Sequence, residues 1–346
     1  MIKSYTENFN DEHELEEAIS RPSNAMIEEM KNMNGDLIFL GVAGKIGISM
    51  ARMAKKACLE ANVTKRIIGV SRFTDEAAQK FLEESGIETI KGDLLEIDFI
   101  ESLPEIENVI YLAGMKFGTD GNEPNTWAMN AYLPGLVADK FKNSRILAFS
   151  TGCVYPFVDT KTGGSKEADL VGPVGEYSQS CLGRERLFEF GSLKYGTNIA
   201  LIRLNYSVEM RYGVLVDIAT KVYNEEPIDL TMGYANVIWQ GDANDMILRS
   251  FNFCSSPAKH INISGPELLS IRDVALKFGK LMDKMVLLEG VENSTALLVN
   301  CSWAYDVLGE PNIALDQIIA WTANWIKKEN KTHNKPTRFE VRDGNY

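Results

Sequence analysis

Glycines recur at every third position in the segment Gly41-Val42-Ala43-Gly44-Lys45-Ile46-Gly47, which directly follows an apolar run. Glycine permits a tight turn and lets a phosphate approach the N–H groups at the start of a helix. Between a strand and a helix, such a turn favours a dinucleotide pyrophosphate over a purely structural role. We therefore expect a nicotinamide dinucleotide to be held here by Gly41, Gly44, Lys45, Ile46 and Gly47.

The end of the next apolar run indicates which dinucleotide is preferred. In dinucleotide-binding βαβ units an acidic residue at this position binds the ribose hydroxyls, but this run ends Val70-Ser71-Arg72-Phe73, without an acid. The hydroxyl of Ser71 and the guanidinium of Arg72 suit a 2′-phosphate, and Lys45 could add a second positive charge. The prediction is NADP rather than NAD, with a solvated surface role for Arg72 as the alternative.

The elements that must position these residues alternate between short apolar strands and longer amphipathic helices, a pattern typical of a parallel α/β sheet. Near-continuous apolar runs indicate strands that are buried on both faces. The expected strands are 36–40, 66–70, 88–90, 108–112, 145–150, 198–203 and 260–263. The expected helices are 46–61, 75–85, 126–141, 178–194, 213–224, 242–253, 271–282 and 315–328.

This pattern predicts an α/β fold, a Rossmann-type doubly wound parallel sheet with a smaller C-terminal substrate-binding domain. Residues 1–34 form an N-terminal helical extension, read as one or two surface helices broken at Pro22. Residues 35–208 form the NAD(P)-binding domain, with a return segment at 236–263. Residues 209–235 and 264–346 form the smaller domain, and the tail from Lys331 is polar and expected to be extended.

The bulk composition excludes several function classes. The net charge of −12 opposes binding to nucleic acid or anionic lipid. We expect neither a secretory signal nor a membrane span, and we expect a cytoplasmic protein. Five irregularly spaced cysteines predict neither a disulfide framework nor a metal site. Only three histidines occur, none near another potential ligand in the sequence, so no metal is expected; they are His13, His260 and His333.

Several further segments resemble the extended short-chain dehydrogenase/reductase family, which comprises nucleotide-sugar epimerases, dehydratases and reductases. The resemblance runs from about residue 35 to about residue 328. Gly92-Asp93-Leu94 is similar to the family's adenine-contacting motif, and Leu112-Ala113-Gly114-Met115-Lys116 to the motif that lines the cofactor after the fourth strand. Asn130 matches the family's structural asparagine, and Ser150-Thr151-Gly152-Cys153-Val154-Tyr155 its fifth-strand motif. The segments 241–243 and 262–265 also match.

The resemblance implies that Tyr177 exchanges a proton with the substrate oxygen while the cofactor exchanges a hydride, and that Thr151 holds the same oxygen. The family helix reads Y-x-x-x-K, but this chain reads Tyr177-Ser178-Gln179-Ser180-Cys181. Glu185, eight residues after the tyrosine as in many members, supports this register. Cys181 therefore takes the position of the lysine that grips the nicotinamide ribose and lowers the pKa of the tyrosine.

The missing lysine raises an energetic problem. Lowering a tyrosine pKa from ~10 to ~7 requires about 4 kcal/mol of differential stabilisation, which a neutral thiol cannot supply. Arg184, seven residues after Tyr177, lies on nearly the same helix face and carries a permanent charge; its alternative is a surface or interface role. The oxidised nicotinamide ring is a second source of positive charge.

The choice of reaction depends on the residues beside Thr151. Family 4,6-dehydratases place Asp-Glu there, whereas this chain has Gly152 and Cys153, which disfavours dehydration. Cys153 resembles the acid/base cysteine of GDP-fucose synthases, with a buried structural cysteine as the alternative. We expect substrate contacts, or else packing and surface roles, from Asn205, Arg211, Tyr212, Trp239 and Gln240.

The sequence thus predicts an NAD(P)-dependent oxidoreductase or epimerase acting on a sugar or nucleotide-sugar. The alternative is a non-catalytic NADP-binding sensor or scaffold that has lost the lysine. RNA binding is disfavoured by the charge. By resemblance, the protein forms a homodimer through the helices that carry Asn130 and Tyr177.

Overall fold

Seven parallel strands form the central sheet of the computed structural model, which describes residues 8–116, 118 and 121–344. Their order is β12-β7-β5-β4-β1-β2-β3, so the chain reverses direction across the sheet between β1 and β4. Such a switch point opens a crevice at the carboxyl ends of the strands. The strands are β1 (Leu37–Leu40), β2 (Ile67–Ser71), β3 (Glu88–Lys91), β4 (Asn108–Tyr111), β5 (Arg145–Thr151), β7 (Ile199–Leu204) and β12 (Lys259–Ile263).

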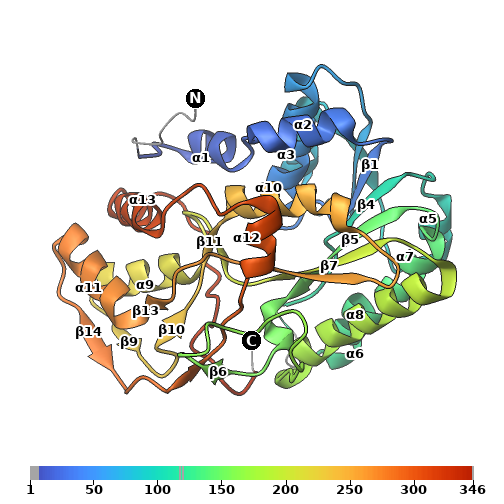
Figure 1. The fold of residues 1–346 in the computed structure, drawn as a ribbon. Coiled ribbons are helices and arrows are strands. Elements are labelled where there is room, and N and C mark those ends of the chain that lie inside the picture. Colours follow the sequence, from blue (N-terminus) through green and yellow to red (C-terminus); the bar gives the residue numbers. More distant parts are fainter. Residues whose placement is uncertain (1–7, 117, 119–120, 345–346) are drawn as a thin grey trace.

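Helices cover both faces of this sheet (Figure 1), as they must because every residue of β1 and β4 is buried. One face packs against α2 (Asn24–Asn32), α3 (Gly47–Glu60), α4 (Glu76–Glu84), α10 (Gln240–Arg249) and α12 (Ser302–Leu308). The other packs against α5 (Ile97–Ser102), α7 (Leu133–Lys140) and α8 (Gly175–Tyr195). The predicted Rossmann-type doubly wound sheet is therefore confirmed.

A second hydrophobic core gathers the C-terminal helices α9 (Val214–Tyr223), α11 (Ile271–Met282) and α13 (Leu315–Lys327). Two-stranded sheets complete this part of the molecule: β6 (Val158–Asp159) with β15 (Thr295–Ala296), β8 (Ser207–Val208) with β11 (Ile238–Trp239), β9 (Pro227–Asp229) with β14 (Leu287–Glu289), and β10 (Tyr234–Ala235) with β13 (Leu269–Ser270). No helix in the described ranges is both long and apolar enough to cross a membrane.

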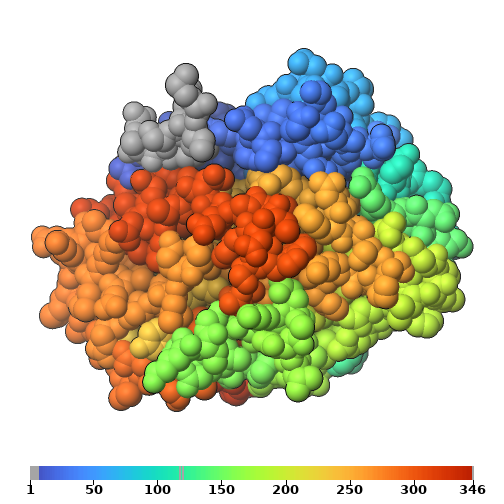
Figure 2. All heavy atoms as spheres, in the orientation of Figure 1, coloured from blue at the N-terminus to red at the C-terminus, as the bar shows by residue number. Residues whose placement is uncertain are grey.

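The N-terminal extension forms the two helices that Pro22 predicts, α1 (Glu12–Ile19) and α2, but they are not simple surface helices. Met26 and Met30 of α2 are fully buried in the core that covers the sheet. Leu15 and Ile19 of α1 are fully buried in the second core. Figure 2 shows this segment lying along the C-terminal part of the chain on one face of the molecule. The extension therefore packs against both cores, which the polar sequence around it did not indicate.

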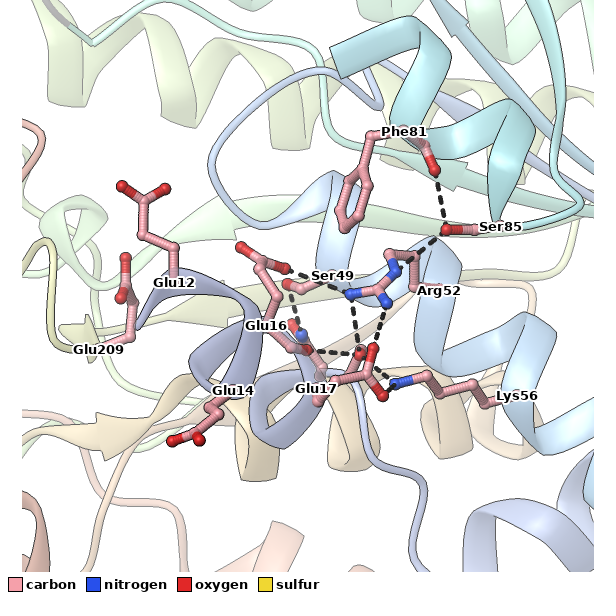
Figure 3. Close-up of polar contacts among 12 residues, drawn as sticks. Glu12, Glu14, Glu16, Glu17, Ser49, Arg52, Lys56, Phe81, Ser85 and Glu209 are labelled. Carbon is pink, nitrogen blue, oxygen red and sulfur yellow. Dashed lines mark hydrogen bonds and ion pairs between the residues drawn. The ribbon is translucent and has the colours of Figure 1, made fainter. Parts of the chain in front are cut away.

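An ion-pair cluster fixes α1 onto α3 (Figure 3). The Arg52 guanidinium binds the Glu17 carboxylate and lies 3.7 Å from Glu16 Oε2, while Lys56 Nζ donates to Glu17 Oε2 at 2.8 Å. Glu16 also accepts from Arg211 Nη2 at 2.6 Å, and Arg211 belongs to the second core's side of the molecule. Glu16 thus connects Arg52 of α3 with Arg211, which follows β8.

Most predicted boundaries agree with the structure to within a few residues. The predicted helix 126–141 is divided into α6 (Glu123–Trp127), a π-helical turn (Ala128–Tyr132) and α7. The predicted helix 242–253 ends as the 3₁₀ turn Ser250–Phe253. A second 3₁₀ turn, Gly152–Val154, follows β5. The tail after α13 has no helix or strand through residue 344, as expected, but it is anchored along its length by contacts described below.

Candidate functional site

The glycine turn joins β1 to α3 and has the geometry that close approach of a ligand requires. Gly41 has φ +89°, and a Cβ there would lie 2.7 Å from the Ala113 backbone nitrogen. A Cβ on Gly47 would lie 2.3 Å from the Val42 carbonyl oxygen, so α3 can begin here only with glycine. The site of a Cβ on Gly44 is uncrowded. These features fit a dinucleotide pyrophosphate at the N-terminus of α3.

Ser71 and Arg72 lie where β2 ends, beside the glycine turn: Gly41 N donates to Val70 O at 2.8 Å. Arg72 is exposed. Asp93 follows β3 at the same edge and caps its own turn by accepting from Leu95 N, while Leu94 is buried in the sheet's core. The carboxyl ends of β1, β2 and β3 therefore place all four predicted residues on the side of the sheet where the adenine half of a dinucleotide would lie.

The segment after β4 forms the opposite wall. Leu112, Gly114 and Lys116 line a cavity of about 400 Å³, together with Gly44, Lys45, Ile46 and Gly47 from the glycine turn. Ala113 is buried behind it. Asn130 lies within the π-helical turn and fixes this segment, accepting from Met115 N and donating to Met115 O, each at 2.8 Å. Its predicted structural role has this geometric basis.

Tyr177, Thr151 and Cys153 line the same cavity. Thr151 ends β5 and Tyr177 lies in the first turn of α8, and the two hydroxyls are hydrogen-bonded. Thr151 Oγ1 also accepts from Cys153 N at 3.1 Å. Burial raises the pKa of Tyr177 well above its ordinary value, and Arg184 and the Thr151 hydrogen bond oppose this shift. Tyr177 is therefore a neutral phenol in this structure.

Cys181, which the resemblance aligned with the family's lysine, is fully buried. Burial raises the pKa of its thiol to about 11, although Arg184 and a hydrogen bond with Tyr177 lower it. A neutral thiol at this position cannot stabilise a tyrosinate.

Arg184 supplies a buried positive charge next to Cys181. Its guanidinium donates to Asn130 Oδ1 at 2.7 Å and to Phe149 O at 2.9 Å, and it lines the cavity. A Cβ on Gly114 would lie 2.4 Å from Arg184 Nη2, so that glycine makes room for the guanidinium. The surface alternative for Arg184 is thus wrong: the side chain is buried and fixed between α8, β5 and the π-helical turn.

The predicted substrate residues separate into two groups. Asn205 and Tyr212 line the cavity, and Asn205 is held by Asn236 Oδ1 at 3.0 Å. Arg211 instead binds Glu209 and Glu16, and Trp239 stacks with Phe9 in the second core. Gln240 donates to Ser49 Oγ. Arg211, Trp239 and Gln240 are therefore not part of the cavity wall in this structure.

One histidine has closer neighbours than the sequence indicated. His260 Nε2 lies 2.9 Å from Glu189 Oε1 and 3.6 Å from Glu185 Oε2. Both carboxylates already bind guanidinium groups, of Arg186 and Arg203 respectively. The expectation that no histidine lies near another potential ligand is wrong, because β12 and α8 are distant in the chain. The arginines make this cluster a poor cation site.

Sequence reasoning missed the contribution of the C-terminal tail. Thr337 lines the cavity, its carbonyl accepts from Lys116 Nζ at 3.3 Å, and its backbone nitrogen donates to Asp217 Oδ2 at 2.8 Å. Further on, Phe339 is buried in the second core, and Gly344 packs against Gly175 at the start of α8. A polar tail without periodicity gave no signal of this position.

Comparisons with known proteins bear on the fold. No protein-family model and no curated protein sequence matches the chain. Solved structures do match, each over 85% of this chain. UDP-glucuronic acid 4-epimerase from Bacillus cereus in complex with NAD is 17% identical, with 96% of its chain covered and a TM-score of 0.70. For dTDP-glucose 4,6-dehydratase from Streptomyces venezuelae with NAD the identity is 16%, the coverage of its chain 97% and the TM-score 0.71, and for UDP-glucose 4-epimerase from Thermotoga maritima they are 16%, 99% and 0.68. The chain therefore has the fold of these nucleotide-sugar epimerases and dehydratases.

Proposed function

We propose that this protein is a nicotinamide-dependent oxidoreductase or epimerase of the extended short-chain dehydrogenase/reductase type that acts on a sugar or nucleotide-sugar. The main support is that one cavity is lined by the glycine turn, the hydrogen-bonded Tyr177–Thr151 pair and Arg184. The residues fit a dinucleotide at the start of α3, and a bound nicotinamide would supply the hydride acceptor or donor. Structural neighbours crystallised with NAD support this assignment.

Tyr177 and Thr151 act on the reacting oxygen. The Thr151 hydroxyl holds a substrate carbonyl or hydroxyl, and Tyr177 donates a proton to it during reduction or accepts one during oxidation. Because the pKa of Tyr177 is raised, the phenol begins in the form that reduction needs. Reduction of a carbonyl is therefore the favoured direction.

Arg184 takes over part of the role of the absent lysine. It lowers the pKa of Tyr177 and of Cys181, and its three hydrogen-bond contacts hold it in place. Developing charge on the tyrosine oxygen is stabilised best by a fixed cation in a dry site. Cys153, which lines the same cavity, is proposed as a second acid/base for epimerisation.

NADP is proposed over NAD because Ser71 and the exposed Arg72 end β2 without an acid. Because two of the similar structures contain NAD, the affinities for NADP and NAD need to be compared directly. Titrating the protein into NADPH or NADH and following the fluorescence of each cofactor compares the two affinities. Arg72→Glu should reverse the preference for NADPH. Equal or stronger binding of NADH by the unaltered chain would contradict the NADP proposal alone.

The main test combines cofactor binding with turnover. NADPH should bind to the purified full chain, and its oxidation at 340 nm should be followed with a panel of keto-sugars and nucleotide-keto-sugars. Tyr177→Phe should retain cofactor affinity and lose about 10²–10⁴-fold in kcat/KM, whereas exposed Tyr132→Phe should change neither. Binding of neither dinucleotide would refute the proposal. Cofactor binding without any turnover, unaffected by Tyr177→Phe, would favour the sensor alternative.

A homodimer is proposed through α8 and the helix before it. Four large apolar side chains on these packed helices are exposed, namely Trp127, Tyr132, Phe190 and Leu193. Such a patch is typical of a protein interface. Light scattering should give twice the chain mass at micromolar concentration, and Phe190→Glu with Leu193→Glu should give the monomer. A monomeric mass for the unaltered chain would exclude this interface.

A further inference from the structure

Two lysines lie in the wall of the candidate active-site cavity, although the chain as a whole carries a net charge of −12. Lys45 comes from the glycine turn, and its Nζ lies 3.0 Å from the centroid of the Tyr212 ring. Lys116 comes from the segment after β4, and its Nζ donates to the Thr337 carbonyl. The two ammonium groups thus belong to different elements that line the same cavity.

Burial and neighbouring charges together set the protonation of both lysines. Burial, followed by the charges of Lys116 and Lys335, lowers the pKa of Lys45 to about 7, and Asp217 and Glu209 only partly oppose this. Burial likewise lowers the pKa of Lys116, against the opposing influence of Cys153, Asp217 and Cys181. The Asp217 carboxylate is occupied by Thr337 and has a raised pKa through burial. A ligand anion would restore full protonation of both lysines.

The C-terminal tail limits the size of what can enter. The tail leaves α13, passes the cavity at Thr337 and, at Gly344, packs against Gly175 at the start of α8. The cavity of about 400 Å³ is near the lower end of the ~300–1,000 Å³ typical of ligand pockets. The nicotinamide end of the cofactor must share it, because the glycine turn and Tyr177 line the same space. One sugar ring fits better than a sugar with its nucleotide.

We infer that the substrate is an anionic monosaccharide, a sugar acid whose carboxylate binds between Lys45 and Lys116 beneath the tail, rather than a nucleotide-sugar. This inference rests on the proposed function, since it assigns the substrate of the same site. The carbon that exchanges the hydride then lies toward Tyr177 and Thr151. Phosphate shares the required anionic chemistry, and the experiment below distinguishes the two.

The test measures ligand binding to the full chain in the presence of saturating NADPH, by isothermal titration at pH 6.5. The probes are galacturonate, galactose, galactose 6-phosphate and UDP-galactose. Galacturonate should bind at least tenfold more tightly than galactose, because hydrogen bonds between a cation and a carboxylate are stronger than those to a neutral hydroxyl. This preference should weaken from pH 6.5 to pH 8.5 as Lys45 loses its proton. The ionisable groups that face Lys45 are Lys116, Lys335, Asp217, Glu209, Tyr212 and His333.

Matched variants locate the anion. Lys45→Met and Lys116→Met should each reduce galacturonate affinity about tenfold, a larger loss than either variant causes for galactose. Lys280→Met, which removes an exposed lysine of α11, should change neither affinity. Circular dichroism spectra and melting temperatures equal to those of the unaltered chain exclude misfolding as the cause.

The outcomes separate this inference from the proposed function. Equal binding of galacturonate and galactose, or tightest binding of UDP-galactose, would overturn the inference while leaving a cofactor-dependent enzyme intact. Tighter binding of galactose 6-phosphate than of galacturonate would overturn the carboxylate assignment and assign a phosphate to the same lysines. Failure of both NADPH and NADH to bind would instead refute the proposed function.

Discussion

The buried ion pair between Arg203 and Glu185 should contribute strongly to the stability of the catalytic helix. Glu185 is on α8, eight residues after Tyr177, and Arg203 is on β7. Arg203 Nε and Nη2 donate to the two carboxylate oxygens at 2.9 and 2.7 Å, and the side chains are 3% and 0% exposed. Solvent therefore screens this pair very little.

Replacing Arg203 by methionine leaves the Glu185 carboxylate buried, with the Ser150 hydroxyl at 2.6 Å and His260 Nε2 at 3.6 Å as its remaining neighbours. Breaking a buried pair in this way costs about 3–5 kcal/mol. The Tyr155 hydroxyl also loses its donor, Arg203 Nη1. We expect the free energy of unfolding to fall by about that amount, because the carboxylate loses its counter-charge without regaining water.

Urea denaturation followed by tryptophan fluorescence measures this change, and calorimetry tests whether the transition is two-state. Arg66→Met is the matched control, because Arg66 and Glu88 are both about half exposed and should couple by less than about 1 kcal/mol. The double variant Arg203→Met with Glu185→Leu should be more stable than Arg203→Met alone. A loss below about 1 kcal/mol for Arg203→Met, equal to the control, would refute the reasoning.

Three further predictions concern the glycine turn, the ion-pair cluster between α1 and α3, and the pH dependence of stability. Gly47→Ala should weaken NADPH binding at least tenfold in a fluorescence titration, because its Cβ would lie 2.3 Å from the Val42 carbonyl; unchanged affinity would mean that the turn does not hold the cofactor. Arg52→Met should lower the free energy of unfolding by about 1–3 kcal/mol, since Glu17 is 40% exposed and the pair is partly screened, and 1 M NaCl should reduce the difference from the unaltered chain. Burial, with Arg211 and Lys45, lowers the pKa of His333 to about 4, so the folded state binds fewer protons than the unfolded state below about pH 6.5. The free energy of unfolding should therefore fall as the pH decreases from about 6.5 to 4, and His333→Gln should reduce this fall. If the urea midpoints of the unaltered chain and of His333→Gln differed by the same amount at every pH in that range, the prediction would be contradicted.

The fold could be predicted because its signals are local. Apolar runs such as 37–40 and 108–111 are buried on both faces, and the glycine spacing marks the first turn. Pro22 correctly separates the first two helices. Short elements such as α5 and α12 escaped notice because six or seven residues give too little periodicity.

The site could be predicted only where motif and register defined it. Thr151 and the glycine turn follow strand ends, Tyr177 lies in the first turn of α8, and all three line one cavity. The sequence could not show that Arg211 would bind Glu209 and Glu16, because Glu16 lies 195 residues away in the chain. Nor could it place Thr337 beside Lys116, since that contact joins residues 221 positions apart.

The position of α2 has a consequence for how the chain folds. Ser23 N donates to Asp245 Oδ1 across 222 positions, and Met26 and Met30 complete a core that also contains Met246 and Ile247 of α10. Both helices also pack against α3, but their packing is complete only once α10, more than two hundred residues further along the chain, is in place. Contacts of such long sequence separation slow folding, because the entropy of closing the loop precedes the gain in contacts. We expect the docking of α2 onto α10 to be a late and slow step of folding.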